Sequence, residues 1–197
     1  MWNDPLGEVH ILVLPRERYP VAGPLPDGFS FVDDVPRSAE KELLQSEFEH
    51  WRIPYERAFP GARADSLFGI SNGDRIVAIT YLGAENEIGL SGYGEGHYPV
   101  IARDFRRKGL NRPRFAKLLE RASAWGLPGV VLAATREGLP EFYERSGALP
   151  VGTLKPIRGT RRTLRRFVNP HRPLARRATE ILREHGAGMR AAPGPTR

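Results

Sequence analysis

The sequence contains no cysteine among its 197 residues. This absence excludes disulfides, thiolate nucleophiles, iron–sulfur clusters and cysteine-bound zinc. Histidine is scarce as well, and its positions lack the short spacings that are typical of metal ligands. We therefore expect no metal site. The five histidines are His10, His50, His97, His171 and His185.

Long hydrophobic runs are also missing, so the sequence predicts no membrane-spanning helix and no membrane partner. The first residues, MWNDPLGEVHILVLP, carry acids where a signal peptide carries bases, and we expect a cytoplasmic protein. Hydrophobic residues make up 40% of the chain and charged residues 27%, which is an ordinary globular composition. A chain of this length can build a core of its own, as a monomer or a homodimer.

Positive charge is unevenly distributed. The formal net charge is +7, but residues 155–197 hold 12 Lys and Arg against two acids, whereas residues 1–154 hold 18 against 21. A basic run is often only a solvated face. Because the whole excess lies in one terminal segment, it also fits the electrostatic footprint of a protein that contacts a polyanion.

Hydrophobic periodicity and turn residues predict a mixed α/β sheet. We expect a proline- and glycine-rich loop over 15–36 and a flexible glycine loop over 92–96. The first strand could also be an edge ribbon, and Asn72-Gly73 predicts a hairpin. Strands are expected at 9–14, 66–70, 75–82, 87–90, 97–103, 129–134, 151–157 and 163–168, and helices at 38–51, 113–125, 139–146 and 174–185.

One strand-to-helix connection carries the features of a phosphate site. A strand ending at Arg103 runs into a short basic loop that contains Gly109 and leads to the helix expected to begin at Pro113. Free amides and the helix dipole make such a terminus attractive to anions, and glycine allows close approach of the backbone. The alternative is an ordinary connection with exposed bases. The bases of the loop are Arg106, Arg107, Lys108 and Arg112.

A second motif follows, in which Tyr143 lies 34 positions after Gly109 and the sequence reads Glu141-Phe142-Tyr143-Glu144-Arg145-Ser146-Gly147-Ala148. Together with Arg106-Arg107-Lys108-Gly109-Leu110-Asn111 it resembles the GNAT superfamily of acyl-CoA N-acyltransferases. In that family the loop reads Arg/Gln-x-x-Gly-x-Gly/Ala, and the later helix ends in Phe-Tyr-Glu-x-x-Gly-Phe. Asn111 replaces a small residue and is expected to tighten the space beside the phosphates, and Ala148 replaces an aromatic one.

The resemblance implies a mostly antiparallel sheet with splayed central strands, helices on both faces, and here an extra basic C-terminal helix. Acetyl-CoA would be the acyl donor, held by the backbone of the fourth strand and by the loop. A GNAT-like domain over 1–168 would be followed by a basic helix and tail over 169–197. The implied donor-binding residues are Val100, Ile101, Ala102, Arg103, Arg106, Arg107, Lys108, Gly109, Leu110, Asn111 and Arg112.

The resemblance also implies catalytic residues. Tyr143 would protonate the departing thiolate, although it could instead be an aromatic side chain packed on the sheet. The amine acceptor needs a base, for which His97 and Glu95 are the nearest candidates, with Glu85 and Glu87 behind them. An Asn that often binds the pantetheine arm in the family is replaced by Arg136. The acceptor would enter over 38–59, where Glu47, Glu49, His50, Trp51 and Tyr55 lie.

Three functions remain open at this point. The first is an acetyl-CoA-dependent N-acetyltransferase that acts on a small amine, a protein amine or an aminoacyl-tRNA. The second is a non-catalytic nucleic-acid-binding module, and the third is a tRNA-dependent aminoacyl transferase. RNA is a candidate partner of the basic C-terminal segment. The arginines expected to contact it are Arg161, Arg162, Arg165, Arg166, Arg172, Arg176, Arg177 and Arg183.

Overall fold

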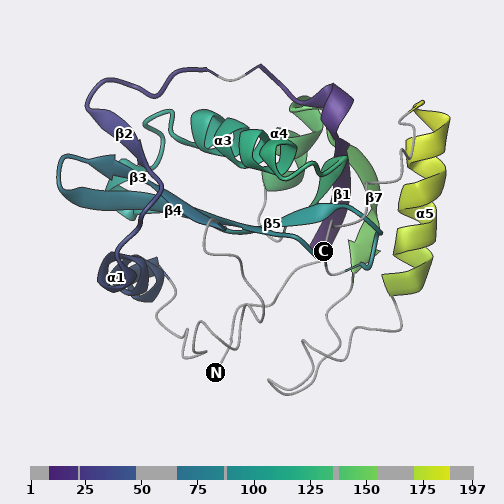
Figure 1. Cartoon of the computed structure of the whole chain (residues 1–197), viewed down its shortest axis with the longest axis horizontal. Coiled ribbons are helices and arrows are strands. Elements are labelled where there is room, and N and C mark those ends of the chain that lie inside the picture. Colours follow the sequence, from purple (N-terminus) through teal and green to yellow (C-terminus); the bar gives the residue numbers. More distant parts are fainter. Residues whose placement is uncertain are drawn as a thin grey trace. The chain divides into compact units, whose positions relative to one another are not determined.

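The structure is a computed structural model of the chain (Figure 1). It describes residues 9–21, 23–47, 66–86, 88–134, 138–154 and 171–186. The chain divides into two compact units. Unit 1 comprises residues 1–3, 21–83 and 96–121, and unit 2 comprises residues 4–20, 84–95 and 122–197.

Unit 1 is built on four neighbouring strands in the order β2 (Phe29–Val32), β3 (Leu67–Asn72), β4 (Arg75–Gly83) and β5 (Gly94–Ile101), with β5 entering the unit at residue 96. The β2–β3 and β3–β4 pairs are antiparallel. Asn72 pairs with Arg75 across the turn, where Gly73 has a φ of +60°. The predicted hairpin is therefore confirmed.

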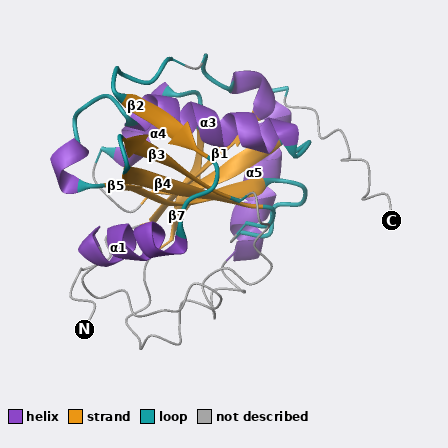
Figure 2. Ribbon diagram, turned by 60° about the vertical axis from the view of Figure 1, so that its left-hand side comes forward, coloured by secondary structure: helices purple, strands orange, loops and turns teal. Residues whose placement is uncertain are grey.

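The helices of unit 1 cover both faces of these strands (Figures 1 and 2). On one face, Leu43 of α1 (Arg37–Glu47) packs in a cluster with Ile79 and Tyr81. On the other, Leu110 at the start of α3 (Asn111–Ala124) packs with Ile70 and Ala78. The short 3-10 helix η2 (Arg103–Phe105) connects β5 to the loop before α3.

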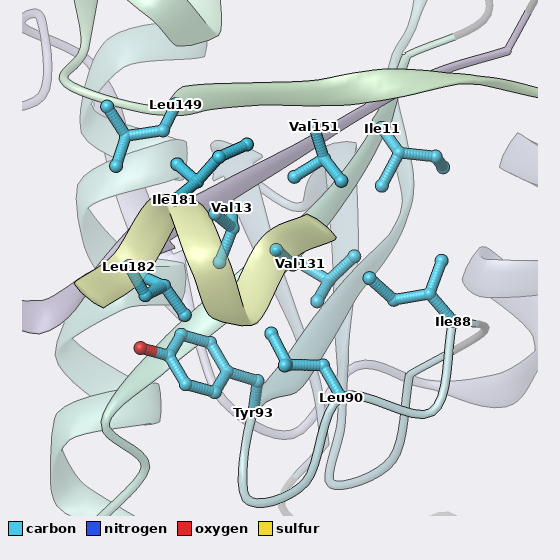
Figure 3. Close-up of a cluster of buried hydrophobic side chains, with 11 residues drawn as sticks. Ile11, Val13, Ile88, Leu90, Tyr93, Val131, Leu149, Val151, Ile181 and Leu182 are labelled. Atoms are coloured by element: carbon cyan, nitrogen blue, oxygen red, sulfur yellow. The ribbon is translucent and has the colours of Figure 1, made fainter. Parts of the chain in front are cut away.

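Unit 2 centres on β1 (Val9–Pro15), which pairs antiparallel with both β6 (Gly129–Ala134) and β7 (Leu149–Leu154). Ile11 and Val13 face α5 (His171–Glu184), where they meet Ile181 and Leu182 (Figure 3). The next residue along β1, Leu14, lies beside Gly147 after α4 (Leu139–Arg145), which contacts β1 and β6. Alternation along β1 therefore places the two helices on opposite faces.

Most predicted elements are present, and the differences are instructive. The segment 15–36 is not wholly loop: it holds η1 (Arg16–Arg18) and β2, because the short β2 run gains its strand conformation by pairing with β3. The strand β1 is paired on both sides and is not an edge. The expected strand over 87–90 is absent at the described residues 88–90.

The glycine-containing segment before residue 97, the end of β5 and the starts of two helices also differ from expectation. Residues 94–96 belong to β5, not to a flexible loop, because the strand continues through both glycines. That strand ends at Ile101, where expectation placed its end at Arg103. The helix α3 begins at Asn111, two residues before the expected Pro113, and α1 begins at Arg37, so Ser38 lies inside it.

Some expectations fall outside the description. The second half of the last expected hairpin and the boundary between residues 168 and 169 lie in the undescribed range 155–170. The splay was expected between β5 and β6, which fall largely in different units, and it stays a prediction. No helix among the described residues has the length and apolar character needed to cross a membrane.

Candidate functional site

The predicted phosphate loop lies wholly in unit 1, between the end of β5 and the start of α3. The loop is tied back to the strand because the Nε of Arg106 donates a hydrogen bond of 3.2 Å to the carbonyl of Ile101. The amide of Arg106 also bonds to the carbonyl of Arg103, which closes η2. The loop therefore has a fixed starting point at the end of the strand.

Two residues of this loop adopt left-handed backbone conformations. Arg107 has a φ of +62° and Gly109 a φ of +78°. A Cβ added at Gly109 would meet nothing closer than Pro26 Cγ at 3.6 Å, so the conformation, and not crowding, calls for glycine. Backbone amides beside left-handed residues can turn toward one side and form a concavity that binds anions.

The start of α3 adds further amide donors. The first turn of a helix has N–H groups without intrahelical acceptors, and Pro113 in the third position lacks an N–H altogether. The amides of Asn111 and Arg112 therefore remain for a ligand or water. The side chain of Leu110 is 1% exposed and packed in the core of unit 1, and this packing anchors the loop to the core. Only the backbone of Leu110 can face a ligand.

Positive charge surrounds the loop. Arg106, Arg107, Lys108 and Arg112 are exposed. The ammonium of Lys108 lies 4.6 Å from the centroid of Phe105, and the guanidinium of Arg75 lies 5.6 Å from it. These cation–π contacts hold part of the charge close to the loop. The combination of donors and charge suits a diphosphate.

The backbone of β5 offers fewer free groups than the resemblance implies. The amide of Ala102 donates to Val77 of β4 at 2.9 Å, so it is already used. Because adjacent residues of a strand point their N–H groups to opposite edges, the amide of Ile101 points away from β4. Pro99 has no N–H to offer on that edge. The amide of Ile101 is thus directed to the edge of β5 away from β4, while the side chains of Val100 and Ala102 are buried and that of Arg103 is exposed.

Tyr143 belongs to unit 2, where it lies on α4 with a side chain that is 4% exposed. Its ring lies 5.5 Å from that of Phe142, and the carbonyl of Tyr143 accepts the amides of Ser146 and Ala148. The next motif residue, Gly147, has a φ of +97°, and an added Cβ would come within 2.8 Å of the carbonyl oxygen of Arg18. This motif is therefore closely packed against the end of β1.

The candidates for the general base differ in burial and in the unit to which they belong. Glu95 lies in β5 within unit 2 and is 2% exposed, so it is a buried strand residue, contrary to the expectation of a glycine-rich loop. His97 lies in β5 within unit 1, and its side chain is outside the described part. Glu85 is exposed, and Glu87 is undescribed.

Other expected site residues fall outside the described ranges. Arg136, which stands where the family often has a pantetheine-binding Asn, is one of them. The part of the expected acceptor surface beyond residue 47 also lies outside the described ranges. Arg172, Arg176, Arg177 and Arg183 are exposed on α5, and Arg177 pairs with Glu180 at 3.6 Å. The undescribed residues are Glu49, His50, Trp51, Tyr55, Arg136, Arg161, Arg162, Arg165 and Arg166, and for Glu47 only the backbone is described.

Two buried polar groups of unit 1 were not predicted from the sequence. Arg114 is 2% exposed, and its position one turn before Leu118 on the apolar stripe of α3 was the available signal. Glu40 of α1 is 6% exposed and accepts a hydrogen bond from the hydroxyl of Tyr81 on β4. Nothing in the local sequence marks Glu40 as buried, because its partner lies 41 positions away.

Two tyrosines of unit 2 are held in the protonated form. Burial raises the pKa of Tyr93 to about 12, and the nearby Glu17 carboxylate adds to the shift. Burial also raises the pKa of Tyr19, helped by Tyr93. Within the described part of the chain, no three His, Asp or Glu residues are grouped as a metal site would require.

Solved structures share this fold. A GCN5-related N-acetyltransferase from Sphaerobacter thermophilus matches with a TM-score of 0.61 at 19% identity, over 74% of this chain and 49% of that chain. Another from Kribbella flavida matches with a TM-score of 0.56 at 17% identity, over 75% of this chain and 56% of that chain. The chain thus spans about half the length of these relatives.

A third match is the glucosamine N-acetyltransferase region of a fungal multi-domain β-N-acetylglucosaminidase, with a TM-score of 0.58 at 17% identity, over 75% of this chain and 20% of that chain. No protein-family model matches the chain, and no curated protein matches its sequence. The structural matches show that the chain has the GNAT fold, a mixed α/β fold with a mostly antiparallel sheet, as the two motifs predicted.

Proposed function

We propose that this chain, whose fold is that of the GCN5-related N-acetyltransferases, transfers an acetyl group from acetyl-CoA to a primary amine. The observation that carries the proposal is the loop between β5 and α3, with its left-handed Arg107 and Gly109, its exposed bases and the helix start that follows. Such an arrangement fits a pyrophosphate chemically. Acetyl-CoA would supply a thioester, whose carbonyl carbon is open to attack by an amine.

In this proposal the loop of unit 1 binds the donor. Amides of the loop and of Asn111 and Arg112 would donate to the phosphate oxygens, and Arg107 and Arg112 would add charge-assisted contacts. The amide of Ile101 would donate to the thioester oxygen, where negative charge develops as the amine attacks. The core packing of Leu110 keeps these donors in place before the ligand arrives.

Proton transfer would involve two further groups. A base, either Glu95 or His97, would take the proton of the amine as the C–N bond forms. Tyr143 would give its phenolic proton to the sulfur as the C–S bond breaks. A phenol has an ordinary pKa near ~10, which suits protonation of a thiolate. The products would be an amide and CoA with a free thiol.

A thermal-shift assay combined with a kinetic assay of thiol release tests this function. We expect the wild-type chain to bind CoA and to release free thiol from acetyl-CoA in the presence of an amine acceptor. In a thermal-shift assay, a ligand at about 100 times its Kd adds about 2.7 kcal/mol of stability. A chain that shows neither a shift with CoA nor thiol release with a panel of small amines, protein N-termini and aminoacyl-tRNA would overturn the proposal.

A polyanion-binding role is a second candidate, and one observation on α5 favours it. Ala178, Ile181 and Leu182 are buried in the core of unit 2, so the helix presents its arginines outward. The acceptor could then be linked to RNA. Because each phosphate contact releases counterions, affinity for single-stranded RNA should fall with salt by a log–log slope of about −0.7 per contact.

Filter binding checks this second role. We expect the chain in which Arg161, Arg162, Arg165 and Arg166 are changed to Ala to bind RNA more weakly than the wild type and with a shallower salt slope. Equal, weak binding by both across a salt series would leave the basic segment without a nucleic-acid role and would favour a small molecule or a protein as the acceptor.

A further inference from the structure

Arg114 of unit 1 is a buried arginine that donates hydrogen bonds to two neighbouring polar side chains. Its Nη1 donates to the hydroxyl of Thr80 at 2.6 Å, and its Nη2 donates to Oδ1 of Asn111 at 2.5 Å. The hydroxyl of Thr80 in turn donates to the carbonyl of Ile79 at 2.7 Å. One chain of hydrogen bonds therefore runs from β4 through Arg114 to the first residue of α3.

This contact fixes the orientation of the Asn111 side chain. An amide side chain has an acceptor end and a donor end that are often hard to tell apart. A guanidinium has donors only, so the end that faces Arg114 must be the carbonyl oxygen. The NH₂ group of Asn111 then points away from Arg114. Asn111 is half-buried, so its donor end lies at the boundary between the core and the loop.

The burial of Arg114 makes this orientation costly to change. A buried guanidinium keeps its charge and needs acceptors, since losing one leaves donors unsatisfied in a medium of low polarity. Rotating Asn111 would turn its NH₂ group against these donors. Arg114 is thus placed to hold Asn111 in this orientation.

We propose that Arg114 is a positioning residue that orients Asn111 so that the Asn111 Nδ2 donates a hydrogen bond to the pyrophosphate of the acyl donor. The proposal rests on the proposed function. It reverses the expectation from the sequence, in which Asn111 in place of a small residue only crowds the phosphates. In this chain the larger side chain adds a hydrogen-bond donor, and Arg114, three residues later, holds that donor in one orientation.

The decisive variants are Asn111→Asp and Asn111→Ala. The Asp variant keeps an oxygen for Arg114, so the fold is retained, but it replaces the NH₂ donors by a negative oxygen. We expect its affinity for CoA to fall at least about tenfold, and that of Asn111→Ala to fall roughly threefold to tenfold. Gln45→Glu makes the same chemical change on the exposed surface of α1 and is the matched control.

A second ligand separates positioning from general structure. Pantetheine lacks the pyrophosphate, so its affinity should change less than twofold in both Asn111 variants, measured by calorimetry beside CoA. With acetyl-CoA as substrate, the KM should rise while kcat changes little. Arg114→Met should also raise the KM for acetyl-CoA, and combining it with Asn111→Ala should add little, because both remove one interaction.

The outcomes are distinct. Wild-type protein that does not bind CoA overturns both the proposed function and this inference. If the wild type binds CoA and Asn111→Ala binds it equally or more tightly, only the positioning role is overturned and the crowding interpretation is correct. Equal losses of CoA and pantetheine affinity in Asn111→Asp would likewise overturn it, because the effect would not involve the pyrophosphate.

Discussion

The two motifs that carry the resemblance differ physically, and their glycines show how. Gly109 and Gly147 both have positive φ angles, +78° and +97°. A Cβ at Gly109 would have no neighbour closer than 3.6 Å, whereas one at Gly147 would lie 2.8 Å from the carbonyl oxygen of Arg18. The loop motif of unit 1 is an open, basic surface, whereas the α4 motif of unit 2 is closely packed against neighbouring backbone. A residue pattern can therefore mark a ligand site in one place and a packing constraint in another.

Gly147→Ala should have the largest effect on stability. The new side chain would be strained by its backbone conformation and would press on the carbonyl of Arg18, so we expect a loss of about 2–4 kcal/mol in the free energy of unfolding. Urea denaturation measures it. Gly126→Ala is the control, because Gly126 has a φ of +73° with nothing within 4 Å of the added Cβ. Equal losses in the two variants would contradict the packing argument.

Tyr143→Phe asks whether the packed α4 motif also takes part in catalysis. Removing the hydroxyl should lower kcat roughly 100-fold with little change in KM for acetyl-CoA, because the phenol would act only as the thiolate departs. Steady-state thiol release measures both constants. Tyr93→Phe is the same change at another buried tyrosine of unit 2 and should leave kcat unaltered. An unchanged kcat in Tyr143→Phe would leave α4 a purely structural motif.

Gly109→Ala tests the open side of the comparison. We expect a loss of about 1 kcal/mol in stability, similar to that of Gly126→Ala, since both positions have left-handed backbones and room for a methyl group. Only Gly109→Ala should weaken CoA binding, because a shifted loop misaligns its amides. Calorimetry and urea denaturation of the two variants give the comparison. Weaker CoA binding in both would indicate a general effect of stability.

The smallest expected effect is on the free energy of unfolding at alkaline pH, and it involves Tyr93 of unit 2. The folded-state pKa of Tyr93 is about 12, above its unfolded value near 10, because its ring is buried against Gly129. A raised pKa stabilises the fold fully below pH 10, and this contribution is lost as the pH rises from 10 through 12. Tyr93→Phe should therefore lose less stability than the wild type over that interval, as urea denaturation at pH 9, 10 and 11 would show. Parallel losses would contradict the assignment.

Local signals predicted the elements that frame the candidate site. The strand at 129–134 has its expected bounds, and the helix around Leu118 was visible from its apolar stripe. Gly109 and Gly147, the glycines of the two motifs, were also identified from the sequence. Boundaries were less accurate, as at Asn111, because capping and strand pairing decide the last residues of an element. The strand β2 was missed because four residues among prolines and glycines carry little pattern of their own.

The kinds of element, their order and the basic loop before α3 could be predicted from local sequence, since periodicity, turn chemistry and charge are properties of neighbouring residues. Three contacts depend instead on long-range packing: Arg114 is buried against Thr80, Glu40 meets Tyr81, and the amide of Ala102 is bonded to β4. Each of these contacts joins residues more than 20 positions apart, and only the packing of strands and helices on one another brings such polar groups within hydrogen-bond distance.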